Sequence, residues 1–189
     1  MNKSLRLGAI LLVITGLTGL ILGIAYKVTE EPIARSRMRQ KMEALRNVLP
    51  QGETFQEITS PEALKEGFLE IHEGYEGDFL VGYALTLPAK GYAGDILLMI
   101  GVSPEGSVLG VRVLAHQETP GLGARGAELA FLEQFQGKNR APLKVVKPPS
   151  QEEGIQAITG ATITTRGIAR GVDKAFIFVK EHFPEGEEE

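Results

Sequence analysis

The sequence predicts an α+β protein in which one N-terminal transmembrane helix is followed by a single domain with a mainly antiparallel sheet. Three observations predict this class. An uncharged apolar run lies near the N-terminus, short β-rich segments separated by turn residues follow it, and an amphipathic helical pattern lies near the C-terminus. With 189 residues, the chain has room for one modest globular domain and one appended segment.

The apolar run covers residues 7–26 and reads LGAILLVITGLTGLILGIAY, without a charged side chain. Such a run of about 20 residues is long enough to cross a hydrocarbon core of roughly 30 Å. A cleaved signal peptide is the alternative, because Gly23-Ile24-Ala25 resembles a small-x-small cleavage site. The run is longer than the usual ~7–15 apolar residues of a signal peptide, so we expect an anchor. Basic residues lie on both sides of the span and do not decide its orientation.

Residues 27–50 are predicted to form an amphipathic helix that connects the span to the domain. Pro32 suits a first helical turn, and Pro50 ends the pattern. An apolar stripe along this helix comprises Met38, Met42, Leu45 and Leu49. We expect the stripe to pack on the domain. The basic residues on the other faces indicate a solvated surface, with a partner site as the alternative.

The domain is predicted to cover residues 51–184, and residues 185–189 form an acidic tail with no inferred role. Its predicted strands are residues 67–72, 79–87, 95–102 and 108–114. The turn residues Ser103–Gly106 predict a hairpin between the last two strands. Helices are predicted around residues 126–135 and 165–183, with a short extended piece near residues 143–147. The last helix presents one apolar face, which we expect to pack on the sheet: Ile168, Val172, Ala175, Phe176 and Val179.

Composition excludes several kinds of site. The chain has no cysteine, which rules out disulfides, thiolate metal sites, iron–sulfur clusters and a cysteine nucleophile. Its three histidines are far apart in sequence, so no metal site is predicted. A net charge of −4 gives no reason to expect nucleic-acid binding. Any redox chemistry therefore requires an organic cofactor.

Residues 121–126 match the G-x-G-x-x-G dinucleotide fingerprint and precede a helical segment. Their context disagrees with a Rossmann fold, because no βαβ unit surrounds them and no acidic residue follows at the distance expected for a ribose contact. A glycine-rich loop that needs left-handed backbone angles or a close approach is the preferred interpretation.

Two loops carry a specific resemblance. Residues 116–123 (HQETPGLG) and residues 159–164 (TGATIT) closely resemble the paired signatures of the FMN-binding domain in the G subunit of Rnf complexes and the C subunit of sodium-translocating NADH:quinone reductase. Residues 91–94 (GYAG), the N-terminal anchor and the helix ending at Pro50 extend the resemblance over nearly the whole chain. The short length fits the Rnf subunit better than its quinone-reductase relative.

The resemblance implies a subunit that relays electrons through FMN in a complex that couples ferredoxin and NAD oxidation–reduction to ion movement. It also implies that a flavin transferase esterifies the FMN phosphate to the threonine that closes the motif, which is Thr162 here. Other membrane and iron–sulfur subunits of the complex are the implied partners. The implied location is the cytoplasmic (inner) membrane, with residues 1–6 in the cytoplasm and the FMN domain on the other side.

The residues expected to bind the cofactor are Tyr92, Glu118, Thr119, Leu122, Gly123, Thr159, Gly160, Ala161, Thr162, Ile163 and Thr164. Tyr92 either stacks on the flavin ring or fills the core. Glu118 either transfers protons or accepts backbone hydrogen bonds that hold its loop, and the second role is preferred. No acid–base catalyst is assigned. Thr164 or Thr165 is expected to cap the last helix.

One residue departs from the family pattern. The modification motif usually begins with aspartate three residues before its Ser/Thr, and Gln156 occupies that position here. An amide lacks the charge that orients a metal-dependent transferase. Two alternatives therefore stay open: an anchored assembly or binding subunit without covalent flavin, and the C-subunit role in the quinone-reductase complex.

Overall fold

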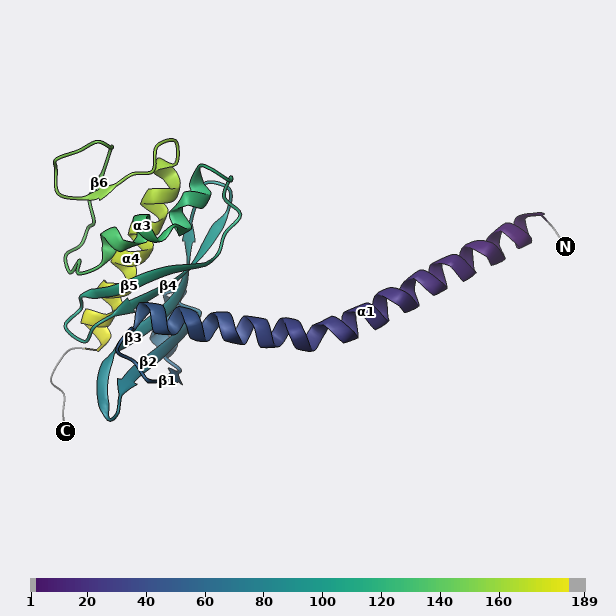
Figure 1. Ribbon diagram of the computed structural model, residues 1–189, viewed down its shortest axis with the longest axis horizontal. Helices are drawn as coiled ribbons and strands as arrows, with labels where there is room; N and C mark the ends of the chain where they lie inside the picture. Colours follow the sequence, from purple (N-terminus) through teal and green to yellow (C-terminus); the bar gives the residue numbers. More distant parts are fainter. Residues whose placement is uncertain (1–2, 184–189) are drawn as a thin grey trace. The chain divides into compact units, whose positions relative to one another are not determined.

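The computed structural model describes residues 3–183, so the predicted acidic tail lies outside the described residues. The chain divides into two compact units, Met1–Lys41 and Met42–Glu189. In chain order the elements are α1 (Lys3–Val48), β1 (Thr54–Ile58), α2 (Pro61–Lys65), β2 (Glu70–Glu76), β3 (Phe79–Lys90), β4 (Asp95–Val102), β5 (Val108–Ala115), the 3-10 helix η1 (Gly123–Ala127), α3 (Leu129–Leu132), the 3-10 helix η2 (Glu133–Phe135), β6 (Val145–Val146), β7 (Ile155–Gln156) and α4 (Thr162–His182) (Figure 1).

The second unit is built on a five-stranded sheet with the strand order β1-β2-β3-β4-β5. Each neighbouring pair is antiparallel, which confirms the predicted α+β class. The predicted hairpin joins β4 to β5, and Gly106 closes its turn with a φ of 77° and an N–H that donates to the Ser103 carbonyl. A separate parallel pair, β6 with β7, contains the extended piece that was expected near residues 143–147.

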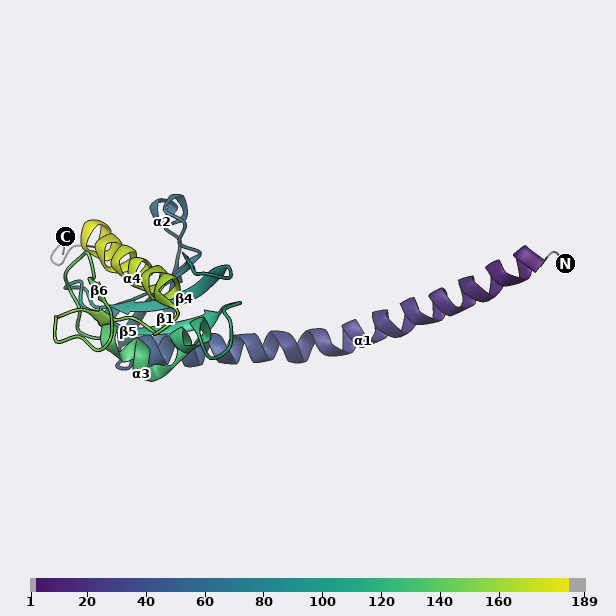
Figure 2. The same cartoon turned by 90° about the horizontal axis from the view of Figure 1, so that it is seen from above.

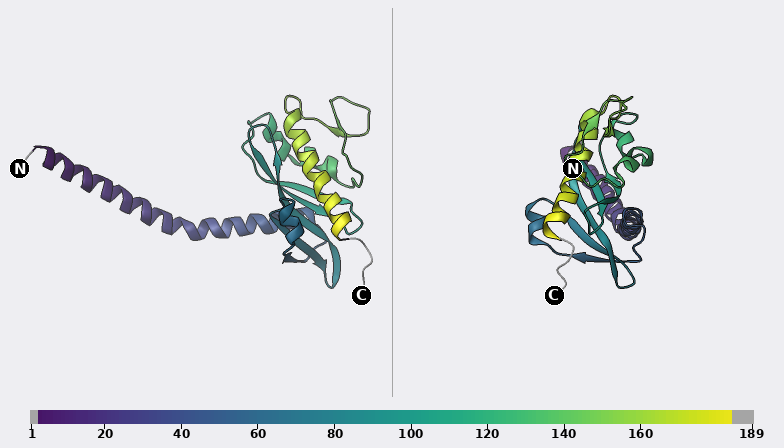
Figure 3. Two further views of the ribbon diagram at one scale, coloured as in Figure 1. Left: turned by 180° about the vertical axis from the view of Figure 1, so that it is seen from behind. Right: turned by 90° about the vertical axis from the view of Figure 1, so that its left-hand side faces the viewer.

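α4 covers one face of the sheet (Figures 2 and 3). Its apolar stripe is buried as predicted and joins the inward side chains of β3 and β4 in the main core. The largest fully buried members of this core include Phe68, Phe135, Phe176 and Phe178. This packing fixes the position of α4, whose first turn forms part of the site described below.

The last turns of α1 pack on the other face. Leu45 and Leu49 of the predicted stripe are buried there, whereas Met38 is exposed. Glycines in β4 and β5 let the helix approach closely: a Cβ at Gly101 would lie 2.0 Å from the Val48 carbonyl oxygen, and one at Gly110 would lie 3.0 Å from that of Asn47. A side chain at Gly101 would therefore displace the end of the helix.

α1 is one uninterrupted helix, in contrast to the predicted span followed by a separate connecting helix. Pro32 lies inside it, where a proline costs one backbone hydrogen bond without necessarily ending the helix. Among residues 3–183, α1 is the one helix long and apolar enough to cross a membrane, and its apolar window is unburied.

Candidate functional site

A cavity of about 450 Å³ lies where three segments of the domain meet. They are the turn after β3, the loop after β5 and the beginning of α4. In Figures 1 and 3 the light green start of α4 lies beside the green segment that contains η1. The cavity is lined by Tyr92, Glu118, Thr119, Leu122, Gly123, Gly160, Ala161, Thr162, Ile163 and Thr164.

These are ten of the eleven residues predicted to bind a cofactor. The eleventh, Thr159, lines a neighbouring cavity of about 270 Å³ together with Gln156 and Arg125. Two loops separated by more than 30 residues in the sequence thus contribute to one cavity. Its volume is within the range usual for small-molecule and cofactor sites.

The Glu118 carboxylate connects the three segments. One oxygen, Oε1, accepts hydrogen bonds from the backbone amides of Tyr92 (2.7 Å) and Ala93 (3.0 Å). The other, Oε2, accepts a hydrogen bond from the Thr164 hydroxyl at 2.7 Å. Glu118 is only 6% exposed. These contacts are those of the loop-holding role preferred from the sequence.

Two glycines make room for this carboxylate. A Cβ at Gly123 would lie 2.0 Å from Oε2 of Glu118, and a Cβ at Gly91 would lie 2.3 Å from Oε1. Neither Gly91 nor Ala93 was predicted to belong to the site. Ala93 contributes its backbone N–H and Gly91 contributes the space left by its missing side chain. Neither contribution can be identified from the residue type alone.

The surroundings of Glu118 favour its ionised form. Burial raises the pKa of its carboxyl group, but hydrogen bonds from Thr164, Ala93 and Tyr92 lower it, and the charge of His116 lowers it further. The net pKa is below the ordinary value of 4.5. A general acid or base at neutral pH needs a pKa near neutrality, so this environment does not suit proton transfer.

α4 begins at Thr162, three residues earlier than predicted. Its N-cap is Ala161, which provides no side-chain hydrogen bond. The expected capping by Thr164 or Thr165 was wrong. The Thr164 hydroxyl is used by Glu118, and the Thr165 hydroxyl donates to the Ala161 carbonyl and accepts from the Ile158 amide. The first amides of α4 thus have no side-chain acceptor, which is the usual condition for anion binding at a helix N-terminus.

Exposed apolar side chains surround the mouth of the cavity. Tyr92 is 73% exposed, Ile163 54% and Leu122 45%. The alternative that Tyr92 fills the core is therefore wrong. Exposed apolar groups gathered around a cavity are typical of a binding site.

The cavity suits a ligand with a flat apolar part and an anionic end. Its lining includes Leu122, Ile163 and Tyr92, and the uncapped start of α4 supplies donors for an anion. FMN combines a flat ring system, apolar at its dimethylbenzene end, with a phosphate, so the apolar side chains and the helix N–H donors fit it. Among the described residues, no cluster of histidine and acidic side chains is suited to hold a metal ion.

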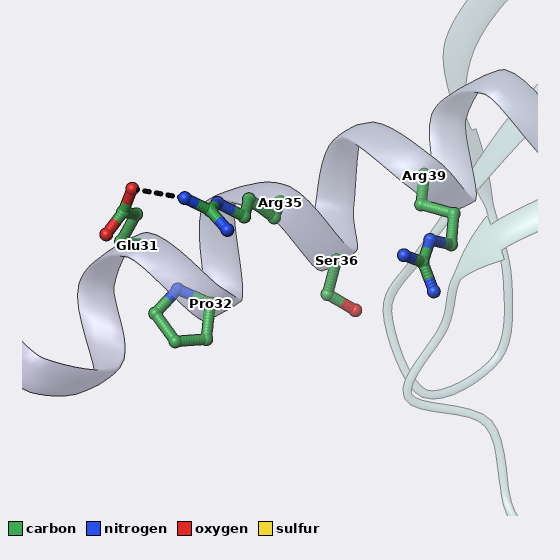
Figure 4. A pocket seen from close by; sticks show the side chains of 5 residues that line it. All are labelled: Glu31, Pro32, Arg35, Ser36 and Arg39. Carbon is green, nitrogen blue, oxygen red and sulfur yellow. Dashed lines mark hydrogen bonds and ion pairs between the residues drawn. The ribbon is translucent and has the colours of Figure 1, made fainter.

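A separate depression lies on α1 and is lined by Glu31, Pro32, Arg35, Ser36 and Arg39 (Figure 4). Its Arg35 guanidinium pairs with Glu31 at 2.6 Å, one helical turn away. None of the predicted site residues contributes to it, and its lining is that of a solvated charged surface.

The glycine-rich segment at residues 121–126 starts as a turn at Gly121, with a φ of 76°, and continues as the 3-10 helix η1 from Gly123. The left-handed angle at Gly121 and the close approach of Gly123 to Glu118 are the features preferred from the sequence. The neighbouring five-stranded sheet is antiparallel, so the dinucleotide-binding alternative is excluded.

Comparison with known proteins identifies the family to which the chain belongs. Residues 91–176 match the model of the FMN-binding domain. The chain is 31% identical to the G subunit of the proton-translocating ferredoxin:NAD(+) oxidoreductase complex of Clostridium ljungdahlii, over 84% of this chain and 82% of the relative. It is 32% identical to the G subunit of the Na(+)-translocating complex of Acetobacterium woodii, over 89% and 87%. The G subunit of the ion-translocating oxidoreductase complex of Vibrio cholerae is 34% identical, over 87% and 84%.

Solved structures show a similar fold. The C subunit of the Na(+)-translocating NADH-quinone reductase from Parabacteroides distasonis matches with a TM-score of 0.58 at 19% identity, covering 82% of this chain and 98% of that one. NqrC from Shewanella oneidensis matches with a TM-score of 0.56 at 18% identity, covering 78% and 99%.

Proposed function

As a member of the G-subunit family of Rnf-type ion-translocating oxidoreductase complexes, this chain is an FMN-binding electron-transfer subunit, and we propose that it carries its FMN as a phosphoester on Thr162. The observation that carries the proposal is the position of Thr162. It is the first residue of a helix with no side-chain cap, and it lines an apolar cavity.

Several features of the chain support attachment at this residue. The Thr162 side chain is half-buried at the cavity, so its hydroxyl has access to a phosphate. Gly160, with a φ of 80°, gives the tight turn that leads into the helix. The free amides of the first turn and the positive end of the helix dipole favour the remaining phosphate charge.

The protein's role is to place and hold the flavin. Bound FMN supplies the one- and two-electron chemistry of the relay. Leu122, Ile163 and Tyr92 provide apolar surface for the ring, and the ionised Glu118 fixes the loops that carry two of these side chains relative to α4. A covalent bond keeps the cofactor from dissociating between electron transfers.

Gln156, which departs from the family motif, lies outside the cavity lining. Its side chain is exposed in β7, and its backbone amide donates to the Gln134 side-chain oxygen at 2.8 Å. Because Gln156 is not part of the cavity lining, we expect it to affect the encounter with the transferase and not the flavin cavity. An unmodified assembly subunit is the alternative that the next experiment separates from an electron carrier.

In native membranes, Thr162→Ala is expected to reduce ferredoxin-dependent NAD reduction to background, because the relay loses its covalently held cofactor. The control is a strain that lacks the chain altogether. Loss of activity in the deletion strain but full activity in the Thr162→Ala strain would identify an assembly subunit instead. The other subunits are measured in the same membranes to show that the complex is still assembled.

Ion movement across the membrane belongs to other subunits. The one candidate span within residues 3–183 has no charged residue between positions 7 and 26, and an ion path normally requires intramembrane polar or charged groups. We propose that the span is an uncleaved anchor and that the FMN-binding domain lies outside the cytoplasm. A long C-terminal domain can be exported despite the basic residues that follow the span.

The topology is testable with tags at both ends of the chain. Protease added to intact spheroplasts is expected to remove the C-terminal tag and to leave a short membrane-bound fragment with the N-terminal tag. Survival of both tags in spheroplasts, with digestion only in inverted vesicles, would reverse the orientation. Absence of the N-terminal tag from the mature protein before digestion would show cleavage of the span.

A further inference from the structure

The geometry points to Arg166 as a positioning residue that binds the flavin phosphate. This inference rests on the proposed attachment at Thr162 and concerns what holds the phosphate once it is there. Arg166 lies outside the cavity lining, one helical turn beyond Thr162 in α4. Thr162 lines the cavity and begins α4, so a phosphate on its hydroxyl would lie at the cavity beside the first turn of the helix.

Helix geometry brings the two side chains together. Residues four apart in an α-helix lie on the same face, with Cβ atoms about 5–6 Å apart. Helical side chains also tilt toward the N-terminus, so the Arg166 side chain leans over the turn that begins with Thr162. An arginine side chain is long enough to cover this distance, and Arg166 is exposed.

The charge of Arg166 is not neutralised within the part of the chain that the structure describes, where it has no ion pair or side-chain hydrogen bond. Its helical neighbours at positions 162, 163, 169 and 170 include no acidic residue. The carboxylates of the site's segments are already used. Asp95 pairs with Lys90 at 2.7 Å, and Glu118 is buried under three hydrogen bonds.

A phosphodiester matches this unpaired guanidinium. It retains one negative charge and two unesterified oxygens, and arginine can donate to both oxygens in a bidentate arrangement. Together with the free amides of the first turn of α4, Arg166 would enclose the phosphate from the side away from the cavity. Because Arg166 is exposed, the interaction is expected to be modest and sensitive to salt.

The test compares the gain in melting temperature on flavin loading in four proteins: wild type, Arg166→Gln, Arg166→Lys and Arg170→Gln. Each is expressed with and without a flavin transferase, and a denaturing fluorescent gel confirms loading. Arg170 is the matched control, because it is an exposed arginine on the same helix, about 12 Å from Thr162 along the axis. Arg166→Gln is expected to lose about 3 °C of the gain relative to wild type.

The gain in melting temperature of Arg166→Lys is expected to fall between those of wild type and Arg166→Gln. Lysine keeps the positive charge but cannot make the bidentate hydrogen bonds of a guanidinium. Arg170→Gln is expected to keep the full gain. The difference in this gain in melting temperature between wild type and Arg166→Gln should vanish near 1 M salt, where the Debye length is about 3 Å. Equal gains in wild type and Arg166→Gln would overturn the role of Arg166 alone. A dark wild-type band would overturn the Thr162 attachment and the Arg166 inference with it.

Discussion

Thr162→Ala is expected to abolish covalent flavin attachment while the domain stays folded. Without the hydroxyl no phosphoester can form, whatever the other contacts contribute. The fold should persist because Thr162 is only half-buried, whereas the core face of α4 is formed by residues further along the helix, including Ile168 and Val172. After co-expression with a flavin transferase, a denaturing gel under ultraviolet light should show a bright wild-type band and a dark Thr162→Ala band of equal protein content.

The neighbouring threonines are the controls. Thr159→Ala should remain bright, because Thr159 is exposed and lines the neighbouring cavity. Thr164→Ala should still carry flavin, but with lower stability and a lower yield of attachment, because Glu118 loses the hydroxyl that donates to it from α4. A bright Thr162→Ala band would refute the assignment of the attachment site.

Glu118→Ala is expected to lower the free energy of unfolding by about 3 kcal/mol. A buried donor that loses its acceptor costs about 1–3 kcal/mol, and we take the lower end for each of the three donors because part of this site is open to water. The amides of Tyr92 and Ala93 and the Thr164 hydroxyl would all lose the carboxylate. The loop at residues 91–94 and the start of α4 would then no longer be connected, so the yield of flavin attachment should fall as well. Urea unfolding and the fluorescent gel measure the two effects.

Glu128→Ala is a suitable control, because it removes an exposed carboxylate that lies 3.6 Å from Arg125. Its expected cost is below about 1 kcal/mol. Equal destabilisation by the two substitutions would contradict the special role of Glu118.

The pH dependence of the free energy of unfolding, compared between wild type and Glu118→Gln, tests the role of the Glu118 charge. Because the pKa of folded Glu118 is lower than its unfolded value of about 4.5, the unfolded state binds more protons as the pH falls. The stabilisation by the carboxylate is therefore complete above about pH 4.5 and is lost as the pH drops through the lowered folded pKa. Glu118→Gln should lose less stability than wild type over that acidic interval, although it is less stable than wild type at neutral pH.

Elements marked by local signals were predicted well from the sequence. The Ser103–Gly106 turn fixed the β4–β5 hairpin, and the periodicity of α4 identified its buried face. β1 was missed, because most of its side chains are exposed and its five residues show no clear alternation. The helix expected over residues 126–135 is interrupted at Glu128, whose ψ of 137° is extended.

In the site, too, residues in local motifs were predicted well, and a role that depends on a distant partner was not. The two loop motifs identified nine residues of the cavity, because their glycines, proline and threonines are concentrated in short segments, and the 91–94 segment supplied the tenth, Tyr92. The role of Thr164 was mispredicted because its partner, Glu118, is 46 residues away in the sequence. A hydroxyl near a helix start has a default local role as a cap, and only the packing of the two loops shows that this hydroxyl is used elsewhere.

The central claim, a flavin held on Thr162 by a phosphoester, is tested most directly on protein purified from its native membrane. The protein is denatured, digested and analysed by peptide mass spectrometry with fragmentation. We expect the peptide that contains residues 159–164 to carry one FMN, with fragment ions that assign it to Thr162. Recovery of this peptide only in unmodified form, with all flavin released on denaturation, would contradict the claim, as would FMN located on Thr159, Thr164 or Thr165.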